Sequence, residues 1–331
     1  MKTRYIFSMG ELKRKDNSIV FRSEKGNIYL PIEDTKELYC MNEVTVNTKF
    51  LDFVAKAGIT IHFFNYHGNY SGTFYPKEQL ISGDLTIRQS LAYIEKRIVI
   101  AKAIVQGIAD NIHEVLYHYY RHGKKDLKPF LDWLKKDVSD LLAKELHIKQ
   151  ILSIEGQIWS RFYDCFQYFL PKDFILNKRV KRPPDNPINA LISFGNTLLY
   201  TKTISAIYYT HLNQSISFLH SPREGRFSLS LDLSESFKPI IVFRTIFDLV
   251  NNRRLQVAKH FDKDLNYALL NEAGKKIFIE AFENRLNESF LHPNLKRKTT
   301  YKSAIKYDAY KLVKFLLEGK AFVPFRLKDK C

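Results

Sequence analysis

The sequence contains little cysteine and no long hydrophobic run. Its 331 residues include only three cysteines, Cys40, Cys165 and Cys331, and no CxxC pair. An odd number without that spacing argues against a disulfide framework and against a zinc site built on thiolates. No apolar run approaches the roughly 18 residues that a membrane helix needs, and the first residues lack the apolar stretch of a signal peptide. We therefore expect a soluble, cytoplasmic protein that does not bind membranes.

Several motifs of nucleotide-binding and hydrolytic enzymes are also missing. The chain has no GxGxxG after a strand, no GxxxxGK[ST] and no GxSxG. It therefore gives no signal for a glycine-rich phosphate loop or for the serine nucleophile of an α/β-hydrolase.

Positive charge, by contrast, is abundant and unevenly placed. The 52 Lys and Arg exceed the 35 Asp and Glu, which gives a net charge of +17. Residues 1–80 contain 11 basic and 9 acidic residues, so an excess of 15 positive charges falls on residues 81–331. Nucleic acid is a natural partner for such an excess, because neutralising its phosphates releases counterions. A charge that only keeps the protein soluble would give the same composition.

The pattern of hydrophobic residues changes near residue 80. Before it, short β-branched or aromatic segments alternate with turn formers, and one helix is expected between Asn47 and Gly58. After about residue 85, apolar residues recur at steps of three and four, as in helices. We expect an α+β multidomain protein, with a small N-terminal β-sandwich at residues 1–83 and a larger all-α domain at residues 84–331. The expected strands lie at 5–7, 18–21, 27–30, 59–64 and 72–75, and the later helices at 188–212, 229–250, 272–288 and 301–318.

A histidine and two acidic residues lie close together in the sequence. If a helix begins near Ser228, Asp232 and Glu235 share one of its faces, and Lys238 follows one step further round. His220 stands on the preceding loop, which can fold back toward that face. The two carboxylates repel each other unless a cation, either Lys238 or a divalent metal, lies between them. One imidazole with carboxylates suits Mg²⁺ or Mn²⁺ better than a structural zinc.

The same residues also allow a purely structural interpretation. Acidic side chains in the first turn of a helix interact favourably with the helix macrodipole and need no ligand. A lone histidine after Phe218-Leu219 is more often an ordinary core or surface residue. The spacing alone therefore leaves both interpretations open.

Glu155 borders the buried stripe of a strongly apolar helix. That stripe consists of Ile151, Ile154 and Ile158. A carboxylate in this position needs a partner, because burying it unpaired costs several kcal/mol. An ordinary salt bridge to Arg161 or Lys149 is the simplest such partner. The next residue, Gly156, costs the helix about 1 kcal/mol relative to Ala and suggests a closely approaching neighbour.

The chain also contains four short basic runs. They lie at residues 13–15, 178–182, 253–254 and 296–298. Such runs are usually solvated surface. With the 19 tyrosines of the chain they would also suit a track for phosphates lined by stacking aromatics.

Four segments in the same order along the chain resemble one family, the universal CRISPR-associated integrases (the first-numbered CRISPR-associated proteins). Ile154-Glu155-Gly156 resembles the family's Glu-Gly helix motif. Residues 186–200, NPINALISFGNTLLY, are similar to its helix NALLSFGYSLLY. Leu219-His220 followed by residues 225–239, GRFSLSLDLSESFKP, resembles its block LH…GR.SLALDLMEEFRP. The N-terminal strand pattern matches as well.

The resemblance implies a subunit that forms a homodimer, with the β-sandwich for dimerisation and partner contacts and the helical domain for catalysis. It implies Mn²⁺ or Mg²⁺ held by Glu155, His220 and Glu235. Asp232 would be a nearby acidic residue of the catalytic site, and Lys238 the cation at the family's Arg/Lys position. The expected partners are double-stranded and branched DNA and a small ferredoxin-like CRISPR adaptation protein. The expected reaction is DNA cleavage and insertion of short foreign fragments into a CRISPR repeat array by 3′-hydroxyl strand transfer.

The sequence departs from the family pattern at a few positions. Ser234 and Ser236 flank Glu235 where the family often has a second acidic residue, and Asn196 stands where Tyr is common. These differences concern the subtype, and the resemblance is strongest to relatives from type I systems. The candidate DNA contacts are the basic residues Arg226, Lys178, Arg179, Lys181 and Arg182.

Two other functions remain as alternatives. One is a non-catalytic nucleic-acid-binding scaffold, in which the acidic cluster only pairs with Lys238 and Arg226. The other is an RNA-processing nuclease. Dependence on a divalent metal separates the first from an integrase, and the choice between single-stranded RNA and branched DNA as substrate separates the second.

Overall fold

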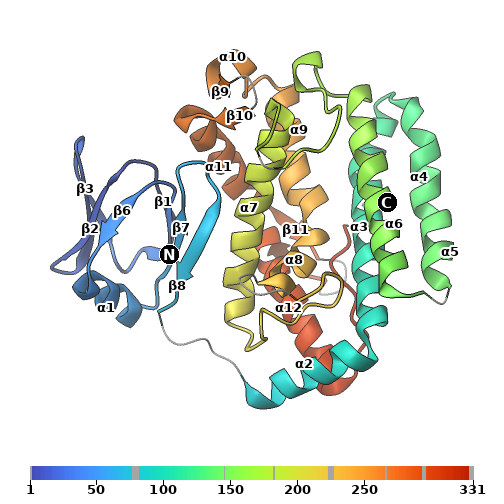
Figure 1. Ribbon diagram of the computed structural model, residues 1–331, viewed down its shortest axis with the longest axis horizontal. Helices are drawn as coiled ribbons and strands as arrows, with labels where there is room; N and C mark the ends of the chain where they lie inside the picture. The colour runs from blue at the N-terminus through green and yellow to red at the C-terminus, as the bar shows by residue number, and fades with distance from the viewer. Residues whose placement is uncertain are drawn as a thin grey trace. The chain divides into compact units, whose positions relative to one another are not determined.

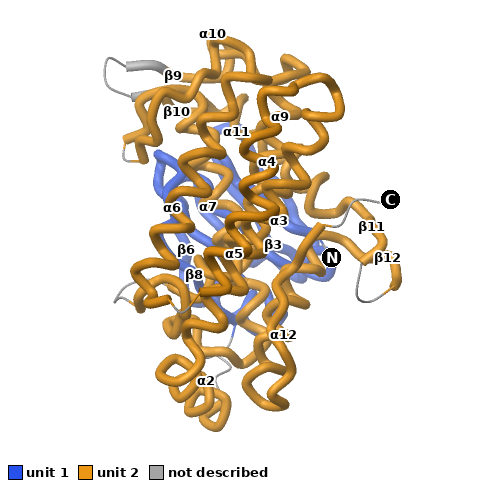
Figure 2. The backbone as a smooth tube through the Cα atoms, turned by 90° about the vertical axis from the view of Figure 1, so that its right-hand side faces the viewer, with its two compact units in different colours: residues 1–80 blue, residues 81–331 orange. Residues whose placement is uncertain are grey.

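The computed structural model describes residues 2–76, 82–144, 146–181, 183–222, 227–264, 267–292 and 296–327. The chain divides into two compact units, residues 1–80 and residues 81–331 (Figure 2).

Unit 1, residues 1–80, contains two four-stranded sheets (Figure 1). One sheet has the strand order β1-β5-β7-β8, formed by Lys2–Ile6, Thr35–Cys40, Thr60–Phe64 and Tyr70–Phe74. The other has the order β4-β3-β2-β6, formed by Gly26–Pro31, Ser18–Ser23, Gly10–Lys15 and Val44–Val46. In the first sheet β1, β5 and β7 are parallel, whereas β8 returns antiparallel to β7.

Both sheets of unit 1 contribute to one hydrophobic core. Leu12 of β2 and Leu38 of β5 are fully buried members of that core, one from each sheet. Helix α1 (Thr48–Lys56) adds its apolar face, and Asn47 caps the helix by accepting a hydrogen bond from the backbone N–H of Phe50 at 2.9 Å. Unit 1 is therefore a β-sandwich with one helix packed into it.

Three strands, β2, β5 and β6, are absent from the sequence-based expectation. β5 contains Lys36 and Glu37, yet it lies inside its sheet between β1 and β7. Glu37 is buried, and the Thr3 hydroxyl donates a hydrogen bond to its carboxylate at 3.1 Å. Pairing with a strand on each side outweighs the low strand propensity of these polar residues.

Unit 2, residues 81–331, is built mainly from helices, and α3 lies beside α4 and α6 while α7 packs against α8 and α12 (Figure 1). The strand-rich first unit followed by a helical one confirms the predicted fold class. The helices are α2 (Gly83–Glu95), α3 (Arg97–Arg121), α4 (Lys128–Lys135), α5 (Asp137–Ala143), α6 (Ile148–Asp164), α7 (Pro187–Tyr208), α8 (Ser228–Glu235), α9 (Arg244–Asn251), α10 (Val257–His260), α11 (Glu272–Asn287) and α12 (Tyr301–Glu318).

The helix expected at residues 229–250 is interrupted. α8 ends at Glu235, a π-helical turn spans Lys238–Phe243, and α9 then begins. Pro239 has no backbone N–H to donate, so the α8 hydrogen-bond pattern does not continue through it. Glu235 and Lys238 therefore lie on either side of a junction and not along one straight helix.

Two short two-stranded ribbons also occur within the helical unit, and the sequence-based expectation of an all-α domain did not include them. β9 (Phe261–Asp264) pairs with β10 (Tyr267–Leu270), and β11 (Ser289–Leu291) pairs with β12 (Lys298–Thr300). Among the described residues, no helix has the length and apolar character needed to cross a membrane.

Candidate functional site

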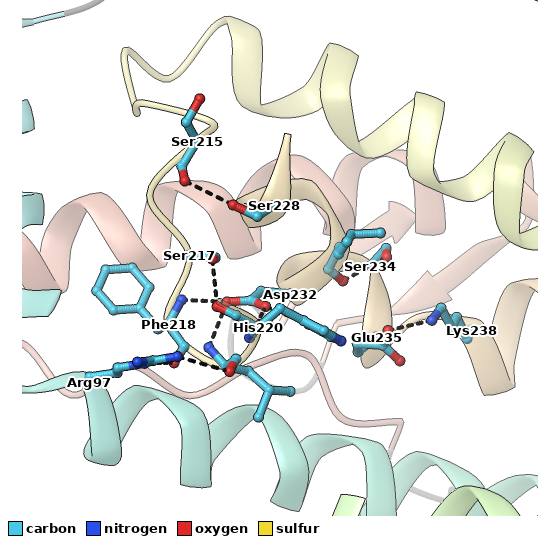
Figure 3. Close-up of polar contacts among 12 residues, drawn as sticks. Arg97, Ser215, Ser217, Phe218, His220, Ser228, Asp232, Ser234, Glu235 and Lys238 are labelled. Carbon is cyan, nitrogen blue, oxygen red and sulfur yellow. Dashed lines mark hydrogen bonds and ion pairs between the residues drawn. The ribbon is translucent and has the colours of Figure 1, made fainter. Parts of the chain in front are cut away.

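Asp232 accepts the hydrogen bonds that organise the candidate site (Figure 3). Its side chain is completely buried on α8. One carboxylate oxygen accepts the backbone N–H groups of Phe218 and Leu219 at 2.6 and 2.8 Å. The other accepts the backbone N–H of His220 at 3.0 Å and the Nδ1–H of its ring at 2.8 Å. Asp232 thus fixes the loop before α8 and orients the imidazole of His220. The loop folds back toward the face of α8 that carries Asp232, as the sequence predicted.

Two further side chains hold the loop that carries His220. Arg97, the first residue of α3, donates from Nε to the carbonyl of Phe218 at 2.8 Å, and its guanidinium lies 4.6 Å from the ring centroid of Tyr93. The Ser217 hydroxyl donates to the carbonyl of His220 at 2.7 Å. Sequence reasoning missed Arg97 and Ser217, because the groups of this loop that they bind are backbone carbonyls, which leave no side-chain pattern.

Glu235, the last residue of α8, is buried and pairs with Lys238. The Lys238 ammonium donates to Glu235 Oε1, and the two side chains are only 17% and 4% exposed, respectively. Glu235 Oε2 is also buried, and within the described residues it has no hydrogen-bond partner. A buried carboxylate oxygen without a partner is costly, so Oε2 marks a position that a cation would fill favourably.

Glu155 comes from α6, and aromatic packing fixes that helix. Trp159 and Phe162 of α6 contact Phe243 of the π-helical turn, with ring centroids 5.6 and 4.9 Å apart. The ring centroid of Trp159 also lies 5.7 Å from Lys238 Nζ, and Trp159 lowers the pKa of Glu155. This packing holds Glu155 near the segment that begins with Lys238.

The acidic and imidazole groups influence one another's ionisation. Burial raises the pKa of Glu155 to about 7, and the charge of Glu235 adds to this effect, whereas Lys238 and His220 oppose it. Burial lowers the pKa of His220, but its hydrogen bond to Asp232 and the charge of Glu235 outweigh burial, so the pKa rises above 6.5. The structure thus brings Glu155, His220 and Glu235 into one electrostatic neighbourhood.

These donor groups fit a divalent cation, although they do not form a compact ligand set. Within the described ranges, no three His, Cys, Asp or Glu side chains lie close enough together to hold an ion as they stand. His220 gives Nδ1 to Asp232, which leaves Nε2 as its ligand nitrogen. With Glu155 and the unpartnered oxygen of Glu235, this gives one imidazole and two carboxylates, which suits Mg²⁺ or Mn²⁺.

Three sequence-based interpretations of these residues are wrong. α8 has no acidic residue in its first turn, so Asp232 does not serve the helix macrodipole. Among the described residues, Glu155 forms no ion pair with Arg161 or Lys149, and the Arg161 guanidinium instead lies 4.2 Å from the centroid of a tryptophan ring of α4. Gly156 has no described atom within 4 Å of the position of an added Cβ, so the expected close neighbour is missing.

The basic residues predicted to contact DNA have different surroundings. Lys178 and Lys181 are exposed. Arg179 is partly buried, and its guanidinium donates to two side chains of α7 at 2.9 Å each, so it fastens the N-terminal end of that helix. Arg182 and Arg226 lie outside the described residues. Contact with DNA stays a prediction for all five.

Comparison with known proteins gives a consistent result over nearly the full length. The family model for CRISPR associated protein Cas1 matches residues 4–284. CRISPR-associated protein Cas1 1 of Methanobrevibacter ruminantium is 42% identical over 326 residues, which cover 98% of this chain and 98% of that protein. The CRISPR-associated endonuclease Cas1 of Fusobacterium nucleatum is 41% identical over 326 residues, which cover 98% of this chain and 96% of that protein.

A solved structure of the same kind shares the fold. TM1797, a CAS1 protein from Thermotoga maritima, matches with a TM-score of 0.84 and 36% identity, over 99% of this chain and 100% of that one. The resemblance seen in the sequence motifs is confirmed, and the chain belongs to the family of CRISPR associated protein Cas1.

Proposed function

We propose that this chain is a divalent-metal-dependent DNA endonuclease and integrase. It would insert short foreign DNA fragments into a CRISPR repeat array by strand transfer from a 3′-hydroxyl. The observation that carries the proposal is the buried Oε2 of Glu235, which has no hydrogen-bond partner among the described residues, with the charges of Glu235 and His220 both acting on the pKa of Glu155. Family membership supports it, because a relative 41% identical is named an endonuclease.

Each residue of the site would have a distinct task. Glu155, His220 Nε2 and Glu235 would hold Mn²⁺ or Mg²⁺, which supplies charge stabilisation at the phosphoryl group and activation of a hydroxyl or water. Asp232 would be a positioning residue, since both of its oxygens already accept hydrogen bonds from the loop of His220. Lys238 neutralises Glu235 in this structure, and with the cation bound it would offer its positive charge to a phosphate oxygen.

The two units would divide the work. The β-sandwich, predicted at residues 1–83, would make the homodimer and bind a small ferredoxin-like adaptation protein. The helical domain, predicted at residues 84–331, would bind double-stranded and branched DNA and carry out catalysis. Its excess of 15 positive charges supports this assignment, because phosphate neutralisation favours DNA binding.

Substitution of the three ligands tests the proposal. We expect Glu155→Gln, His220→Asn and Glu235→Gln each to lower Mn²⁺-supported strand transfer on branched DNA at least about 100-fold, a loss typical of removing a group that stabilises the transition state. Glu280→Gln, at an exposed position of α11, is the matched control and should keep wild-type activity. A DNA end without its 3′-hydroxyl should abolish joining. Activity within twofold of the wild type in all three variants would overturn the proposal.

A non-catalytic scaffold is the second candidate, because Lys238 forms an ion pair with Glu235. It predicts DNA binding that EDTA does not change, with neither cleaved nor joined product. An RNA-processing nuclease would instead cleave single-stranded RNA in preference to branched DNA. Assaying both substrates with and without EDTA separates the three functions.

A further inference from the structure

The last described segment of the chain packs against the junction between Glu235 and Lys238. This segment, residues 319–327, follows α12 without regular secondary structure, and we call it the C-terminal strap. It lies outside residues 4–284, the part matched by the family model.

Asn111 of α3 links the strap to that junction. Its side chain is fully buried, and its amide donates to the carbonyl of Ser236 at 2.7 Å and to the carbonyl of Phe325 at 2.9 Å. Its amide oxygen accepts the backbone N–H of Leu327 at 2.7 Å. Both donor hydrogens and the acceptor are therefore used. Ser236 directly follows Glu235, so one side chain ties the junction and the strap together.

Ring stacking and close packing reinforce this link. Phe325 stacks on Phe237 with ring centroids 5.3 Å apart and an interplanar angle of 9°. Asp308 of α12 accepts the backbone N–H of Phe325 at 2.6 Å. At Gly107, one turn before Asn111, an added Cβ would lie 3.0 Å from the Ser236 hydroxyl. Residues 236 and 237 thus receive a hydrogen bond from Asn111, the stacked ring of Phe325 and the close packing of α3 at Gly107.

We infer that Asn111 and Phe325 are positioning residues, which set the relative placement of Glu235 and Lys238 and so the affinity of the site for its cation. Neither residue touches the proposed ligands. They act through residues 236 and 237, whose backbone determines where the flanking carboxylate and ammonium point. Because packed interiors resist continuous deformation, loss of these contacts would shift the junction as a unit. The link to cation affinity rests on the proposed function, whereas the placement of Lys238 does not.

Tryptophan fluorescence tests the placement without any metal. The chain has two tryptophans, and Lys238 Nζ lies 5.7 Å from the ring centroid of Trp159, so replacing Trp133 by Phe leaves one reporter next to this charge. In that background we expect Asn111→Ala and Phe325→Leu to change the Trp159 emission maximum. Phe282→Leu, which alters an equally buried phenylalanine on α11, is the matched control and should leave it unchanged.

Mn²⁺ binding, measured by electron paramagnetic resonance of the free ion, tests the consequence. We expect Asn111→Ala and Phe325→Leu to weaken binding about tenfold, as for other outer residues that orient ligands, and Phe282→Leu to stay within twofold. Emission like the wild type in both variants would overturn the inference, and so would unchanged Mn²⁺ affinity in both variants when the wild type binds the ion. If the wild type itself bound no Mn²⁺ and the emission still changed, the proposed function would fail while the placement by Asn111 and Phe325 stood.

Discussion

Asp232 shows how a buried charge can be made tolerable by its surroundings. Its carboxylate receives three backbone N–H groups and the imidazole N–H of His220. Each acceptance by an ionised group is worth about 1.5–3 kcal/mol, which offsets the cost of removing the charge from water. The same bonds fix the tautomer of His220, so its remaining ring nitrogen is ready to act as a ligand.

Replacing Asp232 by Asn should damage both the loop and the site. In the Asn variant, an NH₂ group would replace one of the two oxygens that accept backbone N–H groups, so donor would face donor. We therefore expect the free energy of unfolding to fall by about 3 kcal/mol. We also expect Mn²⁺ affinity to fall 10–100-fold, the usual effect of losing a carboxylate that orients a histidine ligand. Urea unfolding and Mn²⁺ titration measure the two effects.

Asp132→Asn provides the comparison. Asp132 is exposed and pairs with Lys128 on the surface of α4, so its replacement should leave both measurements unchanged. Wild-type Mn²⁺ affinity in Asp232→Asn would show that the imidazole does not depend on this carboxylate.

Prediction from sequence works at the residue scale where side chains recognise side chains. Spacing placed Asp232 and Glu235 on one helix and brought His220 back toward it, and the structure shows the contact between His220 and Asp232. Arg97 and Asn111 escaped notice, because each binds backbone carbonyls far away in the sequence. Backbone groups are the same at every position, so no residue pattern identifies which of them will be a partner.

At the scale of elements, two glycines inside helices have opposite surroundings. Gly107 of α3 faces Ser236 and Pro324, and an added Cβ would lie 3.0 and 3.2 Å from their nearest atoms. At Gly156 of α6, none of the described atoms around the helix lies within 4 Å of the position of an added Cβ. The first glycine therefore permits close packing, whereas the second only weakens its helix.

Alanine at these two positions should change stability in opposite directions. We expect Gly107→Ala to cost about 1–3 kcal/mol through overpacking against Ser236 and the strap. Gly156→Ala should stabilise by about 0.5–1 kcal/mol, because Ala has the higher helix propensity and nothing obstructs its methyl group. Thermal unfolding of the pair measures this, and a shift of the same sign in both variants would contradict the packing seen at Gly107.

Helices were more predictable than strands, and the reason is local. α11 and α12 begin and end within one residue of their expected bounds, since capping residues and periodicity lie within the segment itself. The strand β5 is stabilised by pairing with β1 and β7 on either side, and its own polar residues give no sign of this pairing. The break after α8 combines a proline with a π-helical turn, and only the proline is visible in the sequence.

At the scale of the whole molecule, the excess of positive charge lies almost entirely in residues 81–331, and the predicted DNA contacts belong to this part of the chain. Lys178 and Lys181 are exposed, whereas the nearby Arg179 is engaged with α7. We expect Lys178→Ala and Lys181→Ala each to reduce the slope of log K against log salt by about 1. Arg179→Ala should instead lower stability by about 2 kcal/mol, because the buried side chain of Asn189 would lose a hydrogen-bond donor.

Fluorescence anisotropy with labelled DNA over a range of salt concentrations measures these slopes. Lys56→Ala is the control, since this exposed lysine belongs to the unit with little net charge. Slopes unchanged in both lysine variants would remove the 178–182 segment from the DNA-binding surface.

The strap also has a practical consequence for handling this protein. The backbone groups of Phe325 and Leu327 both form hydrogen bonds with the Asn111 side chain. A purification tag or fluorescent protein fused directly behind the strap would strain these hydrogen bonds, and through Asn111 it would disturb the residue that follows Glu235. Cation binding is therefore best measured with tags placed before the first residue. If only fusions behind the strap lose activity, displacement of the strap explains the loss.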